Sequence, residues 1–170
     1  MEVSDIDRQT QFLKGIPPQW HASILELAQN RTFPPGAVLF TEGCLHPDFH
    51  LVMEGHVRLE MAVPNRGRVP LLTVGPGDVL AWSALLSHGR MTTSAVALEK
   101  VSTVAFDGSR LQQLCELHPE IGFQIMRQLA ASLSRRLLAT RLQLLDLFAG
   151  HEPLLDSVHT AANTAIDPEC

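Results

Sequence analysis

Residues 75–97 hold the groups in this sequence that are best suited to bind a charged small molecule. The two glycines at the start of this segment, Gly75 and Gly77, let the backbone approach a ligand closely. Residues 81–86 are expected to form one helical turn, whose free N–H groups attract anions and phosphate above all. An arginine then adds a planar positive charge, and two threonines add hydroxyls. The site residues that we expect are Gly75, Gly77, Ala81, Trp82, Ser83, Ala84, Leu85, Arg90, Thr92 and Thr93.

Short strands are expected to position this loop. From about residue 37 to 106, short apolar runs alternate with Gly and Pro, which is typical of a β-sandwich or barrel. Residues 64–67 read as a hairpin turn. The expected strands are 37–40, 49–53, 57–63, 69–74, 79–80, 94–98 and 101–106.

Helices are expected on both sides of the strands, so the fold class is mainly β with flanking helices. Apolar residues at spacings of three and four predict a helical segment over residues 1–32, ahead of a β region at 33–107. Residues 108–149 are expected to form two helices, a short one and a long one at about 119–148. The tail, 150–170, is expected to be flexible.

The long helix carries a heptad repeat that predicts pairing of two copies into a homodimer. Its seam comprises Met126, Ala130, Leu133, Leu137, Thr140, Leu144 and Leu147. A second stripe, formed by Ile121, Ile125 and Leu129, is expected to pack on the β region. The basic residues along this helix are interpreted as a solvated face; they are Arg127, Arg135, Arg136 and Arg141.

The order of these motifs resembles the cyclic nucleotide-binding domain of the CRP/FNR (catabolite activator) family over about residues 12–148. The resemblance rests on FPPGAVLFTEG at 33–43, FHLVMEGHV at 49–57, GPGDV at 75–79 and SALL at 83–86. It implies a jelly-roll β-roll, also called a double-stranded β-helix, with one helix before it and two behind. It also implies a ligand between the β-roll and the long helix, which Thr140 could reach.

The phosphate-binding cassette departs from the family pattern at three positions. In the family, a glycine takes the turn, a glutamate holds the ribose 2′-hydroxyl, and an arginine pairs with the cyclic phosphate. Here Ala81 and Trp82 replace the glycine and the glutamate, and Arg90 falls one residue earlier than usual. Because Trp offers one donor and no acceptor, it cannot replace the glutamate contact. The resemblance therefore implies a regulatory ligand-sensing domain. Its ligand would be a cyclic nucleotide bound in an altered way or a related phosphate-bearing molecule, or the domain would bind no ligand.

Composition narrows the class of protein. The 170 residues fit about one domain, and 45% hydrophobic against 18% charged residues fit a globular chain. A net charge of -5 argues against direct DNA binding, and no helix-turn-helix pattern follows Phe148, so the output is expected through an unknown protein partner. No apolar run is long enough for a membrane helix, and the acidic residues 1–7 lead us to expect no secretory signal. Three cysteines without a CxxC pair fit a reducing cytoplasm.

Two other classes of function compete with the ligand sensor. One is a cupin-like metal-dependent enzyme that uses His46, His50 and Glu54, which would share one side of the chain if it were extended there, although Pro47 interrupts that run near His46. We expect these histidines to be surface and loop residues instead, and we expect no metal. The other class is an interaction scaffold without a ligand. No nucleophile and base stand at a persuasive spacing, so no enzyme is predicted.

Overall fold

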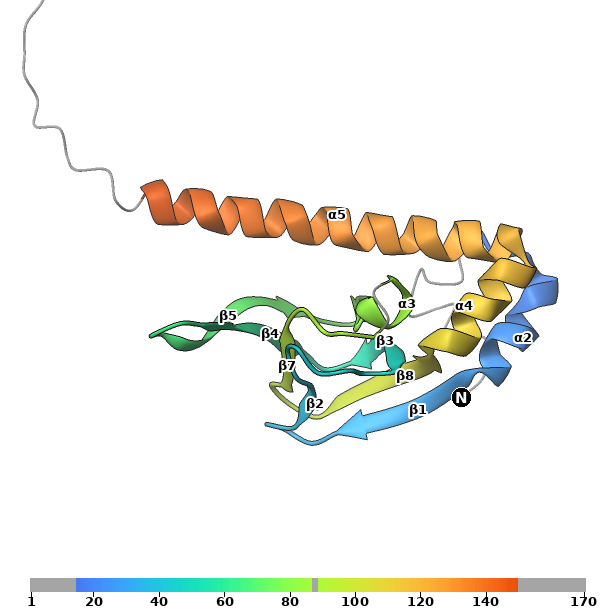
Figure 1. The fold of residues 1–170 in the computed structure, drawn as a ribbon, viewed down its shortest axis with the longest axis horizontal. Helices are drawn as coiled ribbons and strands as arrows, with labels where there is room; N and C mark the ends of the chain where they lie inside the picture. The colour runs from blue at the N-terminus through green and yellow to red at the C-terminus, as the bar shows by residue number, and fades with distance from the viewer. Residues whose placement is uncertain (1–14, 87–88, 150–170) are drawn as a thin grey trace, which may run out of the picture.

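The β region consists of two four-stranded antiparallel sheets, with strand orders β1-β8-β3-β6 and β2-β7-β4-β5 (Figure 1). The computed structural model describes residues 15–86 and 89–149. The strands are β1 (Ala28–Phe33), β2 (Val38–Phe40), β3 (Asp48–Glu54), β4 (Val57–Val63), β5 (Gly67–Val74), β6 (Val79–Leu80), β7 (Ser94–Ala97) and β8 (Val101–Asp107).

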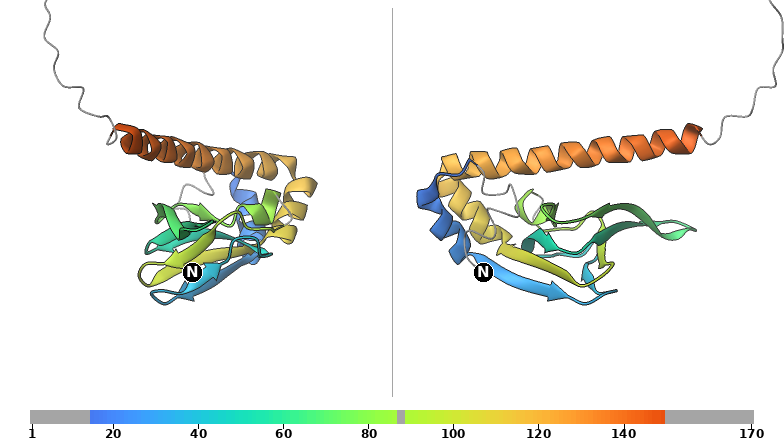
Figure 2. Two further views of the ribbon diagram at one scale, coloured as in Figure 1. Left: turned by 60° about the vertical axis from the view of Figure 1, so that its left-hand side comes forward. Right: turned by 180° about the vertical axis from the view of Figure 1, so that it is seen from behind.

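Helices gather at one end of the strands and along one side of them. They are the 3-10 turn η1 (Pro18–Trp20), α2 (His21–Glu26), α3 (Ser83–Leu86), α4 (Gly108–Leu117) and α5 (Pro119–Ala149). Figure 2 shows that α5 lies along the length of the β region, on the side where α3 also lies. The Asp107 side chain caps α4 by accepting a hydrogen bond from the Arg110 amide at 3.0 Å.

Gly108 lets α3 approach the start of α4. A Cβ at this position would lie 2.6 Å from the carbonyl oxygen of Ala84 and 2.9 Å from that of Pro47. The Gly108 amide donates to the same Pro47 oxygen at 2.9 Å. Because only glycine fits here, the turn that follows β6 is held against both α4 and the segment before β3.

Two hydrophobic cores share β3. The first core lies between the β1-β8-β3-β6 sheet and the helices, and its members include Phe49, Leu51, Phe106 and Ile125. The second lies between the two sheets and includes Val52 and Val101. Since side chains alternate along a strand, β3 feeds both cores and is buried on both faces.

The predicted fold class is confirmed, and several elements lie close to where the sequence places them. The strand at Val57–Val63, the turn after it and the long helix appear as expected. The inner stripe of α5 packs on the β region, because Ile121 and Ile125 are 0% exposed and Leu129 is 3% exposed.

The helical segment predicted over residues 1–32 is wrong at its C-terminal end. Ala28–Phe33 form strand β1, which pairs with β8 along its whole length, from Ala28 opposite Phe106 to Phe33 opposite Val101. Backbone pairing with an existing sheet edge overrides the helical spacing of a short segment. Residues 1–14, and the tail at 150–170, lie outside the described residues.

The predicted seam on α5 differs from the observed exposed face. Met126 and Leu133 are partly buried against the first core, whereas Ala130 and Leu137 are exposed. The Thr140 hydroxyl donates to the carbonyl of Arg136, one turn earlier, at 3.0 Å. The side chains of Leu144 and Leu147 lie outside the described ones. The exposed leucines of α5 are Leu137, Leu138, Leu142 and Leu145.

Candidate functional site

A cavity of about 540 Å³ lies between strand β5 and helix α5. Its volume falls in the range of roughly 300–1,000 Å³ that is usual for small-molecule sites. It is lined by Leu72, Thr73, Val74, Asp78, Arg135, Arg136 and Ala139. Two arginines and a carboxylate beside apolar walls can hold an anionic ligand that also carries hydroxyl groups.

Arg136 is the partly buried cation of this cavity. Its Nη2 donates to the carbonyl oxygen of Val79 on β6, while its buried Nε has no hydrogen-bond partner among the described residues. Burial lowers the pKa of the guanidinium, the neighbouring Asp78 opposes this shift, and Arg135 adds to it. Since a guanidinium stays protonated, Arg136 is a poorly solvated charge that an anion would stabilise.

The loop from Gly75 to Asp78 is fixed to the sheet beneath it. The Gly75 amide donates to Asp78 Oδ2 at 3.1 Å, and the Gly77 amide donates to the carbonyl of Val52 at 2.9 Å. Gly77 has a φ of 86°, which favours glycine. Asp78 therefore reaches the cavity from a rigid turn, and its carboxylate keeps further acceptor sites.

The turn after this loop adopts a left-handed conformation at its first residue, Ala81, where φ is 53°. The amides of Ala84 and Leu85 donate inside the turn, to the carbonyls of Ala81 at 2.9 Å and Trp82 at 3.0 Å. These two N–H groups are thus already occupied. The Trp82 side chain is partly buried and packs against the first core.

Arg90 lies outside the cavity lining. It is exposed, and its Nη1 donates to the carbonyl oxygen of Gly43 at 2.7 Å. Residues 89–91 pair with residues 43–46, since the Met91 amide donates to Cys44 and the His46 amide donates to Gly89. Thr92 and Thr93 follow in the bend before β7. None of the site residues expected from the sequence lines the cavity. Gly75 and Gly77 belong to the same loop as Asp78, which does line it.

Sequence reasoning missed the basic residues of this cavity. It assigned Arg135 and Arg136 to a solvated face, whereas Arg136 is partly buried. Arg136 lies seven residues beyond Leu129 and so continues the stripe that packs on the β region. The position of this arginine on the predicted inner stripe was the signal in the sequence that could have placed it at the cavity.

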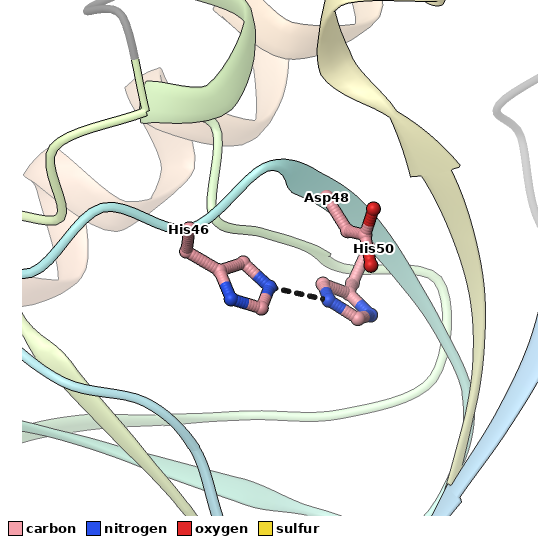
Figure 3. Close-up of side chains that lie close together, drawn as sticks. All are labelled: His46, Asp48 and His50. Atoms are coloured by element: carbon pink, nitrogen blue, oxygen red, sulfur yellow. Dashed lines mark hydrogen bonds between the residues drawn. The ribbon is translucent and has the colours of Figure 1, made fainter.

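The histidines weighed as a metal site form a compact cluster with a different acid. His46, Asp48 and His50 each place one potential ligand atom within 4.8 Å of the others (Figure 3). Glu54 is exposed at the other end of β3. The expectation of surface histidines is wrong for His50, which is 1% exposed, because β3 is buried on both faces.

Comparison with known proteins identifies what this chain is similar to. The family profile of the cyclic nucleotide-binding domain matches residues 30–118. The CRP-like cAMP-activated global transcriptional regulator of Mycobacterium tuberculosis is 30% identical over 146 residues, covering 85% of this chain and 63% of that protein. The chain thus spans less than two thirds of this relative.

Solved structures show the same fold. The catabolite activator protein of Thermus thermophilus superposes with a TM-score of 0.64 at 30% identity, covering 82% of this chain and 63% of that one. A cyclic nucleotide-binding domain from Methylobacillus flagellatus has a TM-score of 0.72 at 19% identity, covering 85% and 80% of the two chains. These similarities do not favour a cupin-like enzyme. Among the described residues, no helix has the length and apolar character needed to cross a membrane.

Proposed function

Because this chain belongs to the cyclic nucleotide-binding domain family, in its CRP/FNR branch, we propose that it senses a phosphate-bearing ligand in the cavity between β5 and α5. The family match supports a cyclic nucleotide-binding regulatory domain. The observation that carries the finer proposal is Arg136, a partly buried guanidinium that lines the cavity with its Nε unpaired among the described residues.

The proposed ligand is a cyclic nucleotide, or a related phosphate ester, bound in an altered way. Arg136, rather than Arg90, supplies the charge for the phosphate, because Arg90 is exposed and bonded to Gly43. With Trp82 in place of the glutamate, Asp78 is the carboxylate in the cavity that can accept from a sugar hydroxyl.

The readout of binding runs through α5, since this helix provides one wall of the cavity. A ligand that contacts Arg136 and β5 together favours one position of α5 over another. The exposed leucines of α5 are proposed to cover those of a second copy, forming a homodimer. An identical helix presents the same apolar stripe, so the contact is self-complementary.

Calorimetric titration of the full chain with cAMP, cGMP and 5′-AMP tests the ligand proposal. We expect one of them to bind and to raise the melting temperature. Arg136→Gln should weaken that binding roughly 10- to 100-fold, as expected for loss of a charge-assisted hydrogen bond. Arg127→Gln, an exposed position on the same helix, is the control for the change of charge.

Arg90→Gln distinguishes the two arginines. It should leave the affinity within about twofold if Arg136 holds the phosphate, since twofold is well below the cost of a lost charged contact. Loss of binding in Arg90→Gln but not in Arg136→Gln would return the phosphate to the cassette. Absence of heat and of a melting shift with all three nucleotides would contradict the ligand class and favour the interaction scaffold.

A further inference from the structure

We propose that His46, Asp48 and His50 form a binding site for one divalent transition-metal ion, separate from the ligand cavity (Figure 3). The proposal does not rest on the proposed function. His46 precedes β3, and Asp48 and His50 are the first and third residues of that strand. Alternation along the strand brings the two β3 side chains to one face, and the preceding loop brings His46 beside them.

The spacing of the two imidazoles suits a shared ion. His46 Nε2 and His50 Nε2 lie 2.9 Å apart, with their rings stacked at an interplanar angle of 23°. Two imidazole nitrogens bound at about 2.0–2.1 Å to one tetrahedral ion stand roughly 3.3 Å apart. A separation of a few tenths of an ångström more would thus convert this hydrogen-bonded pair into a pair of ligands.

Thr103 orients His50 for this role. His50 Nδ1 lies 3.1 Å from Thr103 Oγ1 on β8, and Thr103 is 0% exposed. When Nδ1–H donates to this hydroxyl, Nε2 keeps its lone pair and points at His46. Metal-binding histidines almost always donate a hydrogen bond from the N–H of their other ring nitrogen, which fixes the ring.

The protonation states also fit. Burial is the main cause that lowers the pKa of His50 to about 3, with His46 and Arg31 adding to it. Burial likewise lowers the pKa of His46, against the opposing effect of Asp48. Both imidazoles are therefore neutral near neutral pH, which is the form that coordinates metals.

Asp48 completes the donor set with a carboxylate. Arg31 Nη2 on β1 lies 4.0 Å from Asp48 Oδ2, and the Arg31 side chain is 49% exposed. Arg31 can turn toward solvent when an ion takes its place beside the carboxylate. Two imidazoles and one carboxylate favour zinc and its neighbours over Mg²⁺ or Ca²⁺, and three protein ligands leave a position open.

A bound ion would connect β3 to the end of the cassette. The His46 amide donates to the Gly89 carbonyl at 2.8 Å, and the Met91 amide donates to the Cys44 carbonyl at 3.0 Å. Holding His46 against β3 therefore also holds residues 89–91, which include Arg90. A bound ion would thus hold these two segments together.

Titration of the metal-free full chain with Zn²⁺, followed by metal analysis, tests the site. We expect one tightly bound equivalent, weakened at least tenfold by His46→Gln or Asp48→Asn, and roughly 10- to 100-fold by Thr103→Val. Replacing the buried His50 could also disturb folding. The test therefore uses variants of His46 and Asp48, which are partly exposed. His56→Gln, which removes an exposed histidine paired with Glu99, is the matched control.

Co²⁺ supplies a second readout that does not depend on affinity. The expected spectrum has visible d–d bands of a low-coordinate site and no thiolate charge-transfer band, because no cysteine belongs to the cluster. Binding that is unchanged in both His46→Gln and Asp48→Asn would overturn the proposal. A thiolate band, or no binding at about 100 µM of either ion, far weaker than structural zinc sites, would overturn it too.

Discussion

Single residues depart from family expectation in ways that can be measured, and Ala81 is the plainest case. Its φ of 53° lies in the left-handed region, where the family cassette carries glycine. A Cβ in this region costs about 1–2 kcal/mol. The backbone of the cassette turn is thus retained with a residue that strains it.

Ala81→Gly should stabilise the protein by about 0.5–1 kcal/mol, because relief of the strain exceeds the entropy that glycine adds to the unfolded chain. Urea unfolding at a fixed protein concentration measures the change. The control is Ala131→Gly on the exposed side of α5, which should destabilise by about 1 kcal/mol. Equal destabilisation by both variants would contradict a strained Ala81.

Which residues form the site could be predicted only in part. The glycine and turn pattern at 75–86 located the loop beside the cavity, since turn chemistry is written locally. Arg136 was missed because the acidic net charge of the chain favoured a solvated face, although its place seven residues after Leu129 puts it on the inner stripe. Asp48 was overlooked, although it stands two residues before His50 and so lies on the same face of β3.

At the scale of elements, α5 does two jobs on two faces. Its inner face, with Ile121, Ile125 and Leu129, packs on the first core, and its outer face exposes four leucines among the side chains that the structure describes. Periodicity predicted that both faces exist. It did not predict that Met126 and Leu133 turn inward, because packing on the sheet sets which residues remain exposed.

Leu138→Glu tests the outer face. Leu138 is 60% exposed, so the charge should leave the fold intact while it disrupts a paired helix, shifting a dimer toward monomer. Sedimentation equilibrium over a range of concentrations measures the shift. Leu117→Glu, at a residue 75% exposed on α4, is the matched control. A wild-type chain that stays monomeric at every concentration would contradict the dimer.

β1 shows the opposite limit of sequence reasoning. Only one residue separates α2 from β1, so the apolar spacing of the helix gave no sign of where the helix ends and the strand begins. Only its pairing with β8, a strand more than seventy positions later in the printed sequence, makes it a strand. Long-range pairing of this kind has no local signature.

The whole molecule depends on the first core, which joins the helices to the sheets. Ile125 is 0% exposed in that core. Both tryptophans, Trp20 and Trp82, pack against the same cluster, so their fluorescence reports on it. Loss of this core should therefore unfold helices and strands together.

Ile125→Ala should lower the free energy of unfolding by about 2–5 kcal/mol, as for other buried isoleucines cut back to alanine. Phe123→Ala, at a residue 64% exposed two positions earlier, should change it by less than about 0.5 kcal/mol. Tryptophan fluorescence and far-ultraviolet circular dichroism should give one coincident transition. Similar losses in both variants would contradict this placement of the core.

The bond from Arg136 to the Val79 carbonyl gives α5 a mechanical character. Before that point the helix packs on the first core through its buried stripe, and beyond it the leucines whose side chains are described are exposed. With a rise of 1.5 Å per residue, about 20 Å of helix extends beyond this pivot. A tilt of α5 by about 10° at Arg136 would move the C-terminal end of the helix by roughly 3–4 Å. A sub-ångström adjustment beside Arg136 is thereby magnified where a second helix would feel it.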